Sequence, residues 1–257
     1  MDVSDVLGHL AALRTHKSPG LDGVSNRLLK ECASSIAAPL CHVFNLSLAE
    51  GIFPSVWKRA SITPIYKGKG DRSNATSYRP IALLPAVSKV LEGFAKKQLL
   101  HHCLCNNLIP DEQYGFLPKR SVVWQLLAVL DEWEKAFDEG CLVHACFLNI
   151  AKAFDKVNHR LLLQKLASKG VNGDELAWFK SYLCNRSICT SVDGIWSSMS
   201  PISSSVPQGS VLGPPLFVLY FSDLPDAVEG KCALFADDTL VYDTSCDRTS
   251  AGPCCQL

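Results

Sequence analysis

The feature that most constrains the fold is the stretch KCALFADDTLVY, which lies late in the 257-residue sequence. Two apolar runs, 232–235 and 239–242, flank Ala236, Asp237 and Asp238, and this pattern predicts a β-hairpin with both acids at its turn. Adjacent carboxylates repel one another unless a cation neutralises them. Because Asp is also a common turn residue, the hairpin alone leaves two interpretations open, a solvated turn and a cation site.

A further strand is predicted from the segment CLVHACFLNI, residues 141–150. It is apolar on both faces, which is typical of a buried strand. We expect this strand to run beside the hairpin, so that its last side chain, Asn149, points at Asp237. Nucleotidyl transfer commonly uses two divalent ions about 3.5–4 Å apart, and oxygen ligands from two strands suit Mg²⁺. The two segments together therefore predict a candidate metal site.

The rest of the sequence alternates predicted helices and strands, which indicates an α/β protein. Helices are expected over 3–14, over 26–50 with a cap at Ser25 and a break at Pro39, over 86–106, over 121–138 with a cap at Ser121, over 158–169 and 173–183, and from Pro214 and Pro215 onward. Two strands are expected around a basic loop within 60–85, and a hairpin within 187–200 with its turn at Asp193-Gly194. No internal repeat or linker separates independent domains.

Charge is unevenly distributed along the chain, although the formal net charge is zero. The segment 58–79 holds six basic residues and one acid, Asp71, whereas the segment 223–243 is mainly acidic. A neutral chain counts mildly against nucleic-acid binding. A basic segment combined with an acidic one nevertheless suits a phosphate-rich ligand held at a metal site.

The twelve cysteines include no CxxC pair, so a zinc site is not expected. A chain of this length does not need disulfides to fold, and we expect free, mostly buried thiols. No uncharged apolar run approaches ~18 residues, which predicts no membrane span. The first residues, MDVSDVLGHLAALRTHK, are acidic before they are apolar, unlike a secretory signal. These features predict an intracellular protein, nuclear or cytoplasmic.

Seven motifs, in this order, resemble the reverse transcriptase domain of non-LTR (LINE-type) retrotransposons, nearest the jockey-like group. They are KSPGLDGV (17–24), ITPIYKGKGD (62–71), YRPIALLP (78–85), DEQYGF (111–116), AKAFDKVNH (151–159), SVPQGSVLGPPLF (205–217) and FADD (235–238). The resemblance covers about residues 1–243. FADD alone is a weak signal, but seven motifs in register are specific. Relatedness to group II intron or telomerase enzymes is disfavoured, because GDRSNATSYRPIALLP and VPQGSVLGP are LINE-like.

The resemblance implies the fingers and palm of a right-hand polymerase. The palm would be an antiparallel sheet packed on helices, formed mainly by 140–160 and 205–243. The fingers would be mainly 1–139 and 161–204, and the thumb would be absent. Residues 244–257 look like a divergent tail. The implied reaction is RNA-directed DNA synthesis, with an RNA template, a DNA primer and deoxynucleoside triphosphates as partners.

The resemblance also implies a metal site with two Mg²⁺ or Mn²⁺ ions. Asp237 matches the main metal-binding carboxylate of the hairpin, with Asp238 beside it. The other metal-binding Asp of the family falls on Asn149, which offers an amide oxygen but no charge. At ~4 Å and an effective dielectric of ~20, one charge pair contributes about 4 kcal/mol, or roughly 10³-fold in rate. Asn149 therefore predicts weak or absent activity.

Five further residues match substrate-binding positions of the family. Lys67 and Arg79 match the fingers residues that grip the incoming triphosphate, although either alone would also suit a solvated surface. Phe154 matches the aromatic residue that rejects a 2′-hydroxyl, the alternative being a simple core residue. Gln208 and Gly209 match the loop that lies against the nascent base pair.

Three departures from the family pattern accompany Asn149. Ser205 stands where relatives usually have Gly, Pro215 replaces a usual Leu, and Leu117 replaces a usual Arg. With the expected absence of a thumb, these departures suggest a truncated, degraded copy of a mobile element. Two functions stay open, an impaired reverse transcriptase and a catalytically dead, nucleic-acid-binding remnant of one.

Overall fold

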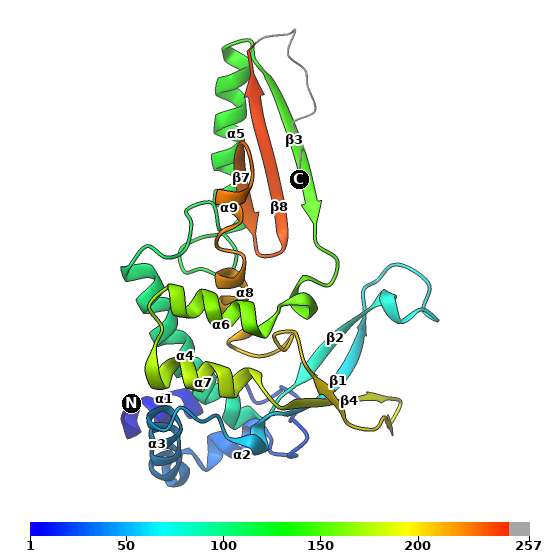
Figure 1. The fold of residues 1–257 in the computed structure, drawn as a ribbon. Helices are drawn as coiled ribbons and strands as arrows, with labels where there is room; N and C mark the ends of the chain where they lie inside the picture. The colour runs from blue at the N-terminus through cyan, green and yellow to red at the C-terminus, as the bar shows by residue number, and fades with distance from the viewer. Residues whose placement is uncertain (247–257) are drawn as a thin grey trace. The chain divides into compact units, whose positions relative to one another are not determined.

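The computed structural model describes residues 1–246, and the chain divides into two compact units (Figure 1). Unit 1 comprises Met1–Leu100 and Phe154–Gly213, and unit 2 comprises His101–Ala153 and the chain from Pro214 onward. Each unit combines helices with its own β-sheet. The expected α/β class is therefore confirmed. Within residues 1–246, no helix has the length and apolar character needed to cross a bilayer.

The sheet of unit 1 is built on a long antiparallel hairpin of β1 (Arg59–Tyr66) and β2 (Tyr78–Leu83). Strand β4 (Arg186–Val192) lies parallel to β1 on its other side. Two short strands, β5 (Ile195–Trp196) and β6 (Ser200–Ile202), pair antiparallel with β4. The sheet thus joins segments more than a hundred residues apart in the sequence.

Helices account for most of the remainder of unit 1. They are α1 (Val3–Ala11), α2 (Asn26–Glu31), α3 (Ala33–Ala49), most of α4 (Ala86–Cys105), α6 (His159–Ser168) and α7 (Gly173–Leu183), with 3-10 turns at Ser55–Trp57, Ala75–Ser77 and Ala153–Lys156. A buried aromatic group links the early and late segments: the ring of Phe53 lies 5.4 Å from Trp178 and 5.1 Å from Tyr182. Trp178 donates to the Ser47 hydroxyl at 3.0 Å, so the indole N–H is satisfied inside the core.

Unit 2 is a three-stranded antiparallel sheet in the order β3-β8-β7, with β3 at Leu142–Asn149, β7 at Lys231–Phe235 and β8 at Asp238–Ser245. Helix α5 (Val122–Asp138) runs along one face of this sheet (Figure 1). There Val129 and Trp133 pack on Leu240 and Tyr242. On the opposite face, the buried side chains of Cys232, Leu234 and Val241 contact Leu224 of α9 (Leu224–Ala227). Helix α9 follows α8 (Gly213–Tyr220).

Most of the predicted helix boundaries are confirmed to within a few residues, because capping residues mark them. Ser25, Ser121 and Asn158 each accept a backbone N–H three residues on, at the starts of α2, α5 and α6. The predicted turn at Asp193 and Gly194 is also confirmed, with φ of 49° and 81°, as expected for a type I′ hairpin.

The predicted break at Pro39 is wrong, since Pro39 lies inside α3. The break falls at Cys32, which ends α2 and begins α3, and whose carbonyl accepts from Ser35 and Ile36. Proline removes one helical hydrogen bond at its own position. The buried face of α3, which includes Ala37 and Phe44, offsets that loss by packing.

The prediction that β3 is buried on both faces is also wrong. β3 is an edge strand within the described sheet, and its side chains alternate between exposed and partly covered. Phe147 is 77% exposed and Leu142 is 44% exposed. The apolar residues of β3 therefore include side chains that no other part of the described unit covers.

The expectation of free thiols alone is wrong, because Cys141 and Cys246 form a disulfide. β3 and β8 pair up to Leu142 and Ser245, so the next residues on each strand face one another. The strand pairing also extends β8 two residues into the segment expected to be a divergent tail, and residues 247–257 lie outside the described part. Of the eight other described cysteines, four are buried and Cys105 is exposed.

Candidate functional site

The carboxylate hairpin predicted from the sequence is present in unit 2. β7 and β8 pair as far as Phe235 and Asp238, which leaves Ala236 and Asp237 as a two-residue turn. Ala236 has a φ of 59°, in the left-handed region that such turns require. Its side chain is buried, whereas Asp237 is half-buried and Asp238 is exposed.

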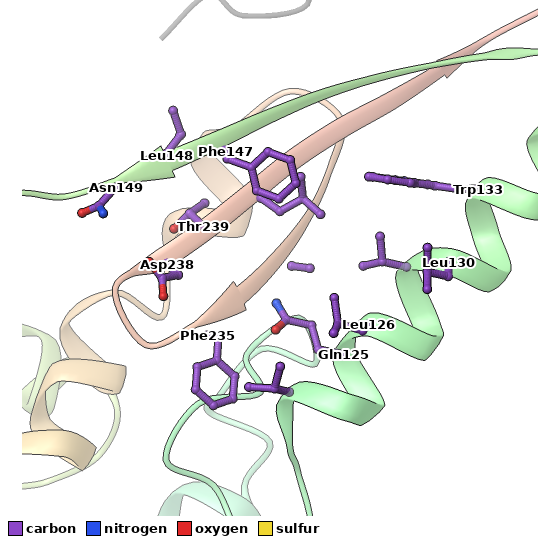
Figure 2. Close-up of a pocket in the computed structure, with 14 residues that line it drawn as sticks. Gln125, Leu126, Leu130, Trp133, Phe147, Leu148, Asn149, Phe235, Asp238 and Thr239 are labelled. Carbon is purple, nitrogen blue, oxygen red and sulfur yellow. The ribbon is translucent and has the colours of Figure 1, made fainter.

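Asn149 lies beside this turn at the end of β3, and its Cα partner is Asp238. The sequence interpretation had aimed it at Asp237, so the register differs by one residue. Directly opposite residues of antiparallel strands carry their side chains on the same face. Figure 2 shows Asn149 and Asp238 together at the hairpin end of the sheet. An amide therefore faces a carboxylate across the strand pair.

A cavity of about 440 Å³ lies between this face of the sheet and α5 (Figure 2). Asn149, Asp238 and Thr239 line it at the hairpin end, while Leu126 and Trp133 of α5 line it elsewhere. Asp237 is not among its lining residues. The cavity is therefore mostly apolar, with its oxygen-bearing side chains near the turn.

The donors at the hairpin end fit a hard divalent cation, since Mg²⁺ prefers carboxylate and carbonyl oxygens. Asp237 and Asp238 supply carboxylates and Asn149 supplies an amide oxygen. In the described part of the chain, no three His, Cys, Asp or Glu side chains gather where they could hold a metal. If Asn149 served as the third donor, that donor would be neutral and the set would carry two negative charges.

Residues 111–116, the DEQYGF segment, hold the turn in place through hydrogen bonds. The buried Gln113 side chain accepts from the N–H groups of Gly115 at 2.7 Å and Ala236 at 3.1 Å. A Cβ on Gly115 would lie 2.3 Å from the Ala236 nitrogen, so only glycine allows this approach. The N–H of Leu234 also donates to the Glu112 carbonyl at 2.8 Å. These contacts fix the position of the two acids.

Arg120 in turn fixes the segment that carries Gln113. Its Nη1 donates to the carbonyls of Asp111 and Gln113 at 2.7 Å and of Pro110 at 3.2 Å. Its Nη2 donates to the Asp111 carboxylate at 2.8 Å. The five N–H donors of Arg suit such a cluster of acceptors. These roles were not predicted: the Gln113 contact with Ala236 joins segments 123 residues apart, and the Arg120 contacts depend on the loop conformation of residues 110–113.

Lys67 and Arg79 lie in unit 1, at the same end of the β1–β2 hairpin. Arg79 pairs with Ile65, and the Lys67 N–H donates to the Ser77 carbonyl at 2.9 Å. Both side chains are exposed. The Lys67 ammonium donates to the Thr76 carbonyl at 2.8 Å. Two exposed cations therefore lie at the same end of one hairpin.

Phe154, Gln208 and Gly209 are brought together within unit 1. The Val206 N–H donates to the Phe154 carbonyl at 3.2 Å, and the Gln208 carbonyl accepts from the Ala82 N–H at 2.7 Å. Gly209 has a φ of 122°, and a Cβ there would lie 2.4 Å from the Ala82 carbonyl oxygen. The loop therefore packs its backbone directly on β2, which requires glycine.

A residue that the sequence interpretation missed, Glu92 of α4, anchors the same loop. It is fully buried, and one carboxylate oxygen accepts from the N–H groups of Val211 at 2.8 Å and Leu212 at 3.2 Å. Burial raises the pKa of Glu92, against the opposing influence of Arg186 and of the two N–H donors. The only sequence signal for a buried acid here was the position of Glu92 among apolar residues of a predicted helix, between Leu91 and Phe94.

Ser205 occupies a backbone conformation that favours glycine, with a φ of 92°. Its N–H donates to the Val157 carbonyl at 2.9 Å, and its own carbonyl lies 2.7 Å from a ring nitrogen of His159. These bonds hold the loop in place despite the strain of a non-glycine residue there. The other departures are accommodated: Leu117 is buried, and Pro215 lies in the first turn of α8, where no N–H partner is needed.

Of the eight residues predicted at the site, Asn149, Asp237 and Asp238 lie in unit 2 and the other five in unit 1. Within unit 2, Asn149 and Asp238 face one another across β3 and β8, and Asp237 lies in the adjoining turn. Within unit 1 the loop residues gather around β2, and Lys67 and Arg79 lie at the end of the same strand pair.

Comparison with known proteins identifies a matching family and several similar proteins. The family described as "Reverse transcriptase (RNA-dependent DNA polymerase)" matches residues 66–252. The chain is 35% identical over 251 residues to the RNA-directed DNA polymerase from mobile element jockey of Drosophila melanogaster, covering 95% of the chain and 27% of that protein. It is 32% identical over 258 residues to a probable RNA-directed DNA polymerase from transposon BS of the same species, covering 97% of the chain and 28% of that protein.

A third relative is the probable RNA-directed DNA polymerase from transposon X-element of Drosophila melanogaster, 35% identical over 243 residues. The match covers 92% of the chain and 26% of that protein, so the chain spans about a quarter of the length of these curated relatives. The resemblance drawn from the seven motifs is thereby confirmed. Since the family match covers well over half of the sequence, the chain belongs to the reverse transcriptase (RNA-dependent DNA polymerase) family.

Proposed function

We propose that the chain is the fingers and palm of a reverse transcriptase from a jockey-like non-LTR retrotransposon. It would extend a DNA primer with deoxynucleotides along an RNA template. The palm would be formed mainly by 140–160 and 205–243, and the fingers mainly by 1–139 and 161–204. The observation that carries the proposal is the cross-strand pair of Asn149 and Asp238 beside Asp237.

In this proposal, Asp237 and Asp238 hold two Mg²⁺ or Mn²⁺ ions, and Asn149 contributes an amide oxygen. When bound, such ions activate the attacking 3′-hydroxyl and neutralise charge on the leaving pyrophosphate. The carboxylates of the chain orient the ions because the Gln113 contact holds the turn to which they belong. Most of the remaining catalysis is positioning of the reacting groups.

The substrate-binding roles follow the same logic. Lys67 and Arg79 bind the triphosphate, since a Lys point charge and an Arg fork suit phosphate oxygens. Phe154 excludes a 2′-hydroxyl by lack of room, which selects deoxynucleotides. Gln208 and Gly209 lie against the nascent base pair, where the missing Cβ of glycine permits close approach.

We further propose that Asn149 impairs this activity. The site loses one of three negative charges that would balance the ions. Because Asn149 and Asp238 are exposed, water screens part of the loss. In water an added carboxylate ~4 Å from a divalent ion gains about 2 kcal/mol, or roughly 30-fold, whereas the single charge pair at the effective dielectric of ~20 used above gives about 4 kcal/mol, or roughly 10³-fold. We expect the true factor to lie between these limits.

A primer-extension assay with Mg²⁺ or Mn²⁺ tests the proposal. The chain itself should give little product, and Asn149→Asp should give roughly 30- to 1000-fold more. Asp237→Asn in the Asn149→Asp background should abolish the gain. The proposal fails if Asn149→Asp stays inactive with both metals, or if the unaltered chain is already fully active.

A second candidate function is RNA binding without catalysis. The neutral amide at position 149 and the basic segment 58–79 favour it. This alternative would be supported if fluorescence anisotropy showed RNA binding while neither the unaltered chain nor Asn149→Asp extended a primer. Metal-dependent extension restored by Asn149→Asp would support the polymerase.

A further inference from the structure

A second cavity, of about 370 Å³, lies in unit 1 between strands β1, β2 and β4 and the loop that carries Gln208. Its walls are largely apolar, with Ile62, Ala82 and Ile188 among them. Pro80 also lines it and is exposed, so the cavity reaches the protein surface. Gln208, which we place against the nascent base pair, is among its lining residues, but no role has been given to the buried cations that line the rest of it.

Arg186 is the first of two buried cations that line the cavity. The residue is only 3% exposed. Its Nη1 donates to the Tyr182 carbonyl at 3.0 Å, and its guanidinium lies 4.9 Å from the centre of the Tyr182 ring. Its Nη2 is buried and has no hydrogen-bond partner within residues 1–246. Arg stays charged in proteins, and an unpaired buried N–H of a charged group is costly. The site therefore lacks an acceptor.

Lys58 is the second buried cation, at 8% exposed. Its ammonium donates to the Ser181 hydroxyl at 3.3 Å, which leaves further N–H donors. Burial and the neighbouring Arg186 lower the pKa of Lys58. Two like charges in one cavity repel each other, and an anion between them would remove that cost.

Asp155 is the acid that lines the cavity, and it accepts from the Gln208 amide at 3.4 Å. Glu92 also acts on Arg186 electrostatically, but it does not line the cavity, and its carboxylate accepts the Val211 and Leu212 N–H groups. The lining side chains thus carry two positive charges and one negative charge. Their balance of one positive charge suits a singly charged anion.

We propose that this cavity binds one phosphodiester group of the RNA template strand through Lys58 and Arg186. A phosphodiester carries one negative charge, which matches the cavity, whereas a deoxynucleoside triphosphate carries several. Nucleic-acid backbones are held mainly by Lys and Arg contacts to phosphate, and the apolar walls suit the attached sugar or base. The inference rests on the proposed function, because it assigns the template to a site beside the Gln208 loop.

The test measures binding of a short fluorescent single-stranded RNA to the full chain by anisotropy at several salt concentrations. Lys58→Met keeps the aliphatic stem and removes the charge. It should weaken binding about tenfold and lower the slope of log affinity against log salt by about 0.7. Lys97→Met, at an exposed lysine of α4, is the matched control and should change neither. Lys58→Arg should retain binding.

A second variant covers the case in which Lys58→Met does not fold. Ser204 lines the cavity and is exposed, so Ser204→Glu places a negative charge at its mouth without altering the buried cations. It should also weaken RNA binding several-fold, whereas Ser34→Glu, at an exposed position of α3, should not. Equal RNA affinity of each variant and its control would overturn the proposal.

Free nucleotide and inorganic phosphate identify the source of the anion. Affinity for a deoxynucleoside triphosphate should be the same in Lys58→Met and Lys97→Met, and inorganic phosphate should compete with RNA only weakly. Loss of nucleotide affinity with unchanged RNA affinity would overturn the proposal. Failure of primer extension in Asn149→Asp would refute the polymerase proposal alone, since the RNA measurement does not need catalysis.

Discussion

Replacing Asn149 by Asp places a third carboxylate directly opposite Asp238 in the β3–β8 pair. Cα atoms of opposite residues in antiparallel strands lie about 4.5–5.5 Å apart. At ~5 Å in water, two like charges repel by about 0.8 kcal/mol, and like charges directly opposite one another across strands are destabilising. Without divalent metal, Asn149→Asp should therefore melt about 2–3 °C below the unaltered chain.

Divalent metal should reverse this order. The new carboxylate attracts a divalent ion at ~4 Å by about 2 kcal/mol in water, which tightens binding roughly 30-fold. A ligand that binds only the folded state stabilises it increasingly as its concentration exceeds the dissociation constant. With saturating Mg²⁺ or Mn²⁺, Asn149→Asp should gain more melting temperature than the unaltered chain. Differential scanning calorimetry with chelator and with metal measures both effects.

The double variant Asn149→Asp with Asp238→Asn is the matched control. It keeps the net charge of the unaltered chain and removes the facing carboxylates. It should show neither the loss of stability in chelator nor the additional gain with metal. The reasoning is refuted if Asn149→Asp responds to metal no more than this double variant does.

Three further variants, at Ser205, Gly115 and Glu92, test how the loops of the site are held, and Gly8→Ala serves as a control for Gly115→Ala. Ser205→Gly should raise the free energy of unfolding by about 1 kcal/mol, because Ser205 has a φ of 92°; urea denaturation measures it. Gly115→Ala should cost roughly 1–3 kcal/mol, because its Cβ would lie 2.3 Å from the Ala236 nitrogen. Gly8→Ala, which meets nothing within 4 Å inside α1, should instead stabilise by about 0.5–1 kcal/mol. Burial raises the folded-state pKa of Glu92 above its ordinary 4.5, so the unaltered chain should lose stability relative to Glu92→Gln as pH rises from that value through the folded-state pKa. A stability difference that does not change with pH would contradict this account of Glu92.

Local signals explain what could be predicted from the sequence. Caps at Ser25 and Ser121, the Asp193-Gly194 turn and the apolar runs of the carboxylate hairpin each act within a few residues. The strand pairing of 142–149 with the hairpin was also predicted, because an apolar strand that ends at Asn149 could run beside the hairpin and bring its last side chain near the acids. These features place the acids and Asn149 at one end of one sheet.

Long-range contacts explain what could not be predicted. The Gln113 contact to Ala236 spans 123 residues, and the Glu92 contact to Val211 spans 119. The disulfide between Cys141 and Cys246 closes a separation of 105 residues. No periodicity or turn signal encodes such pairs, because each depends on the final placement of two distant segments.

The pairing of β3 with β8 was predicted only in part: the strand's neighbour was correct, but its register was not. The sequence placed Asn149 beside the turn but aimed it at Asp237, whereas the strands pair it with Asp238. A shift of one residue reverses the face on which a side chain lies. The two-residue turn at Ala236 and Asp237, which makes Asp238 the first residue of β8 rather than part of the turn, became evident only in the structure.

Anomalous diffraction from Mn²⁺ tests the central claim most directly. The measurement uses crystals of the Asn149→Asp chain with a primer–template and a deoxynucleoside triphosphate. We predict Mn²⁺ peaks within coordinating distance of the carboxylates at positions 149, 237 and 238. Ordered crystals with the hairpin turn well resolved but no Mn²⁺ at these three positions would contradict the account.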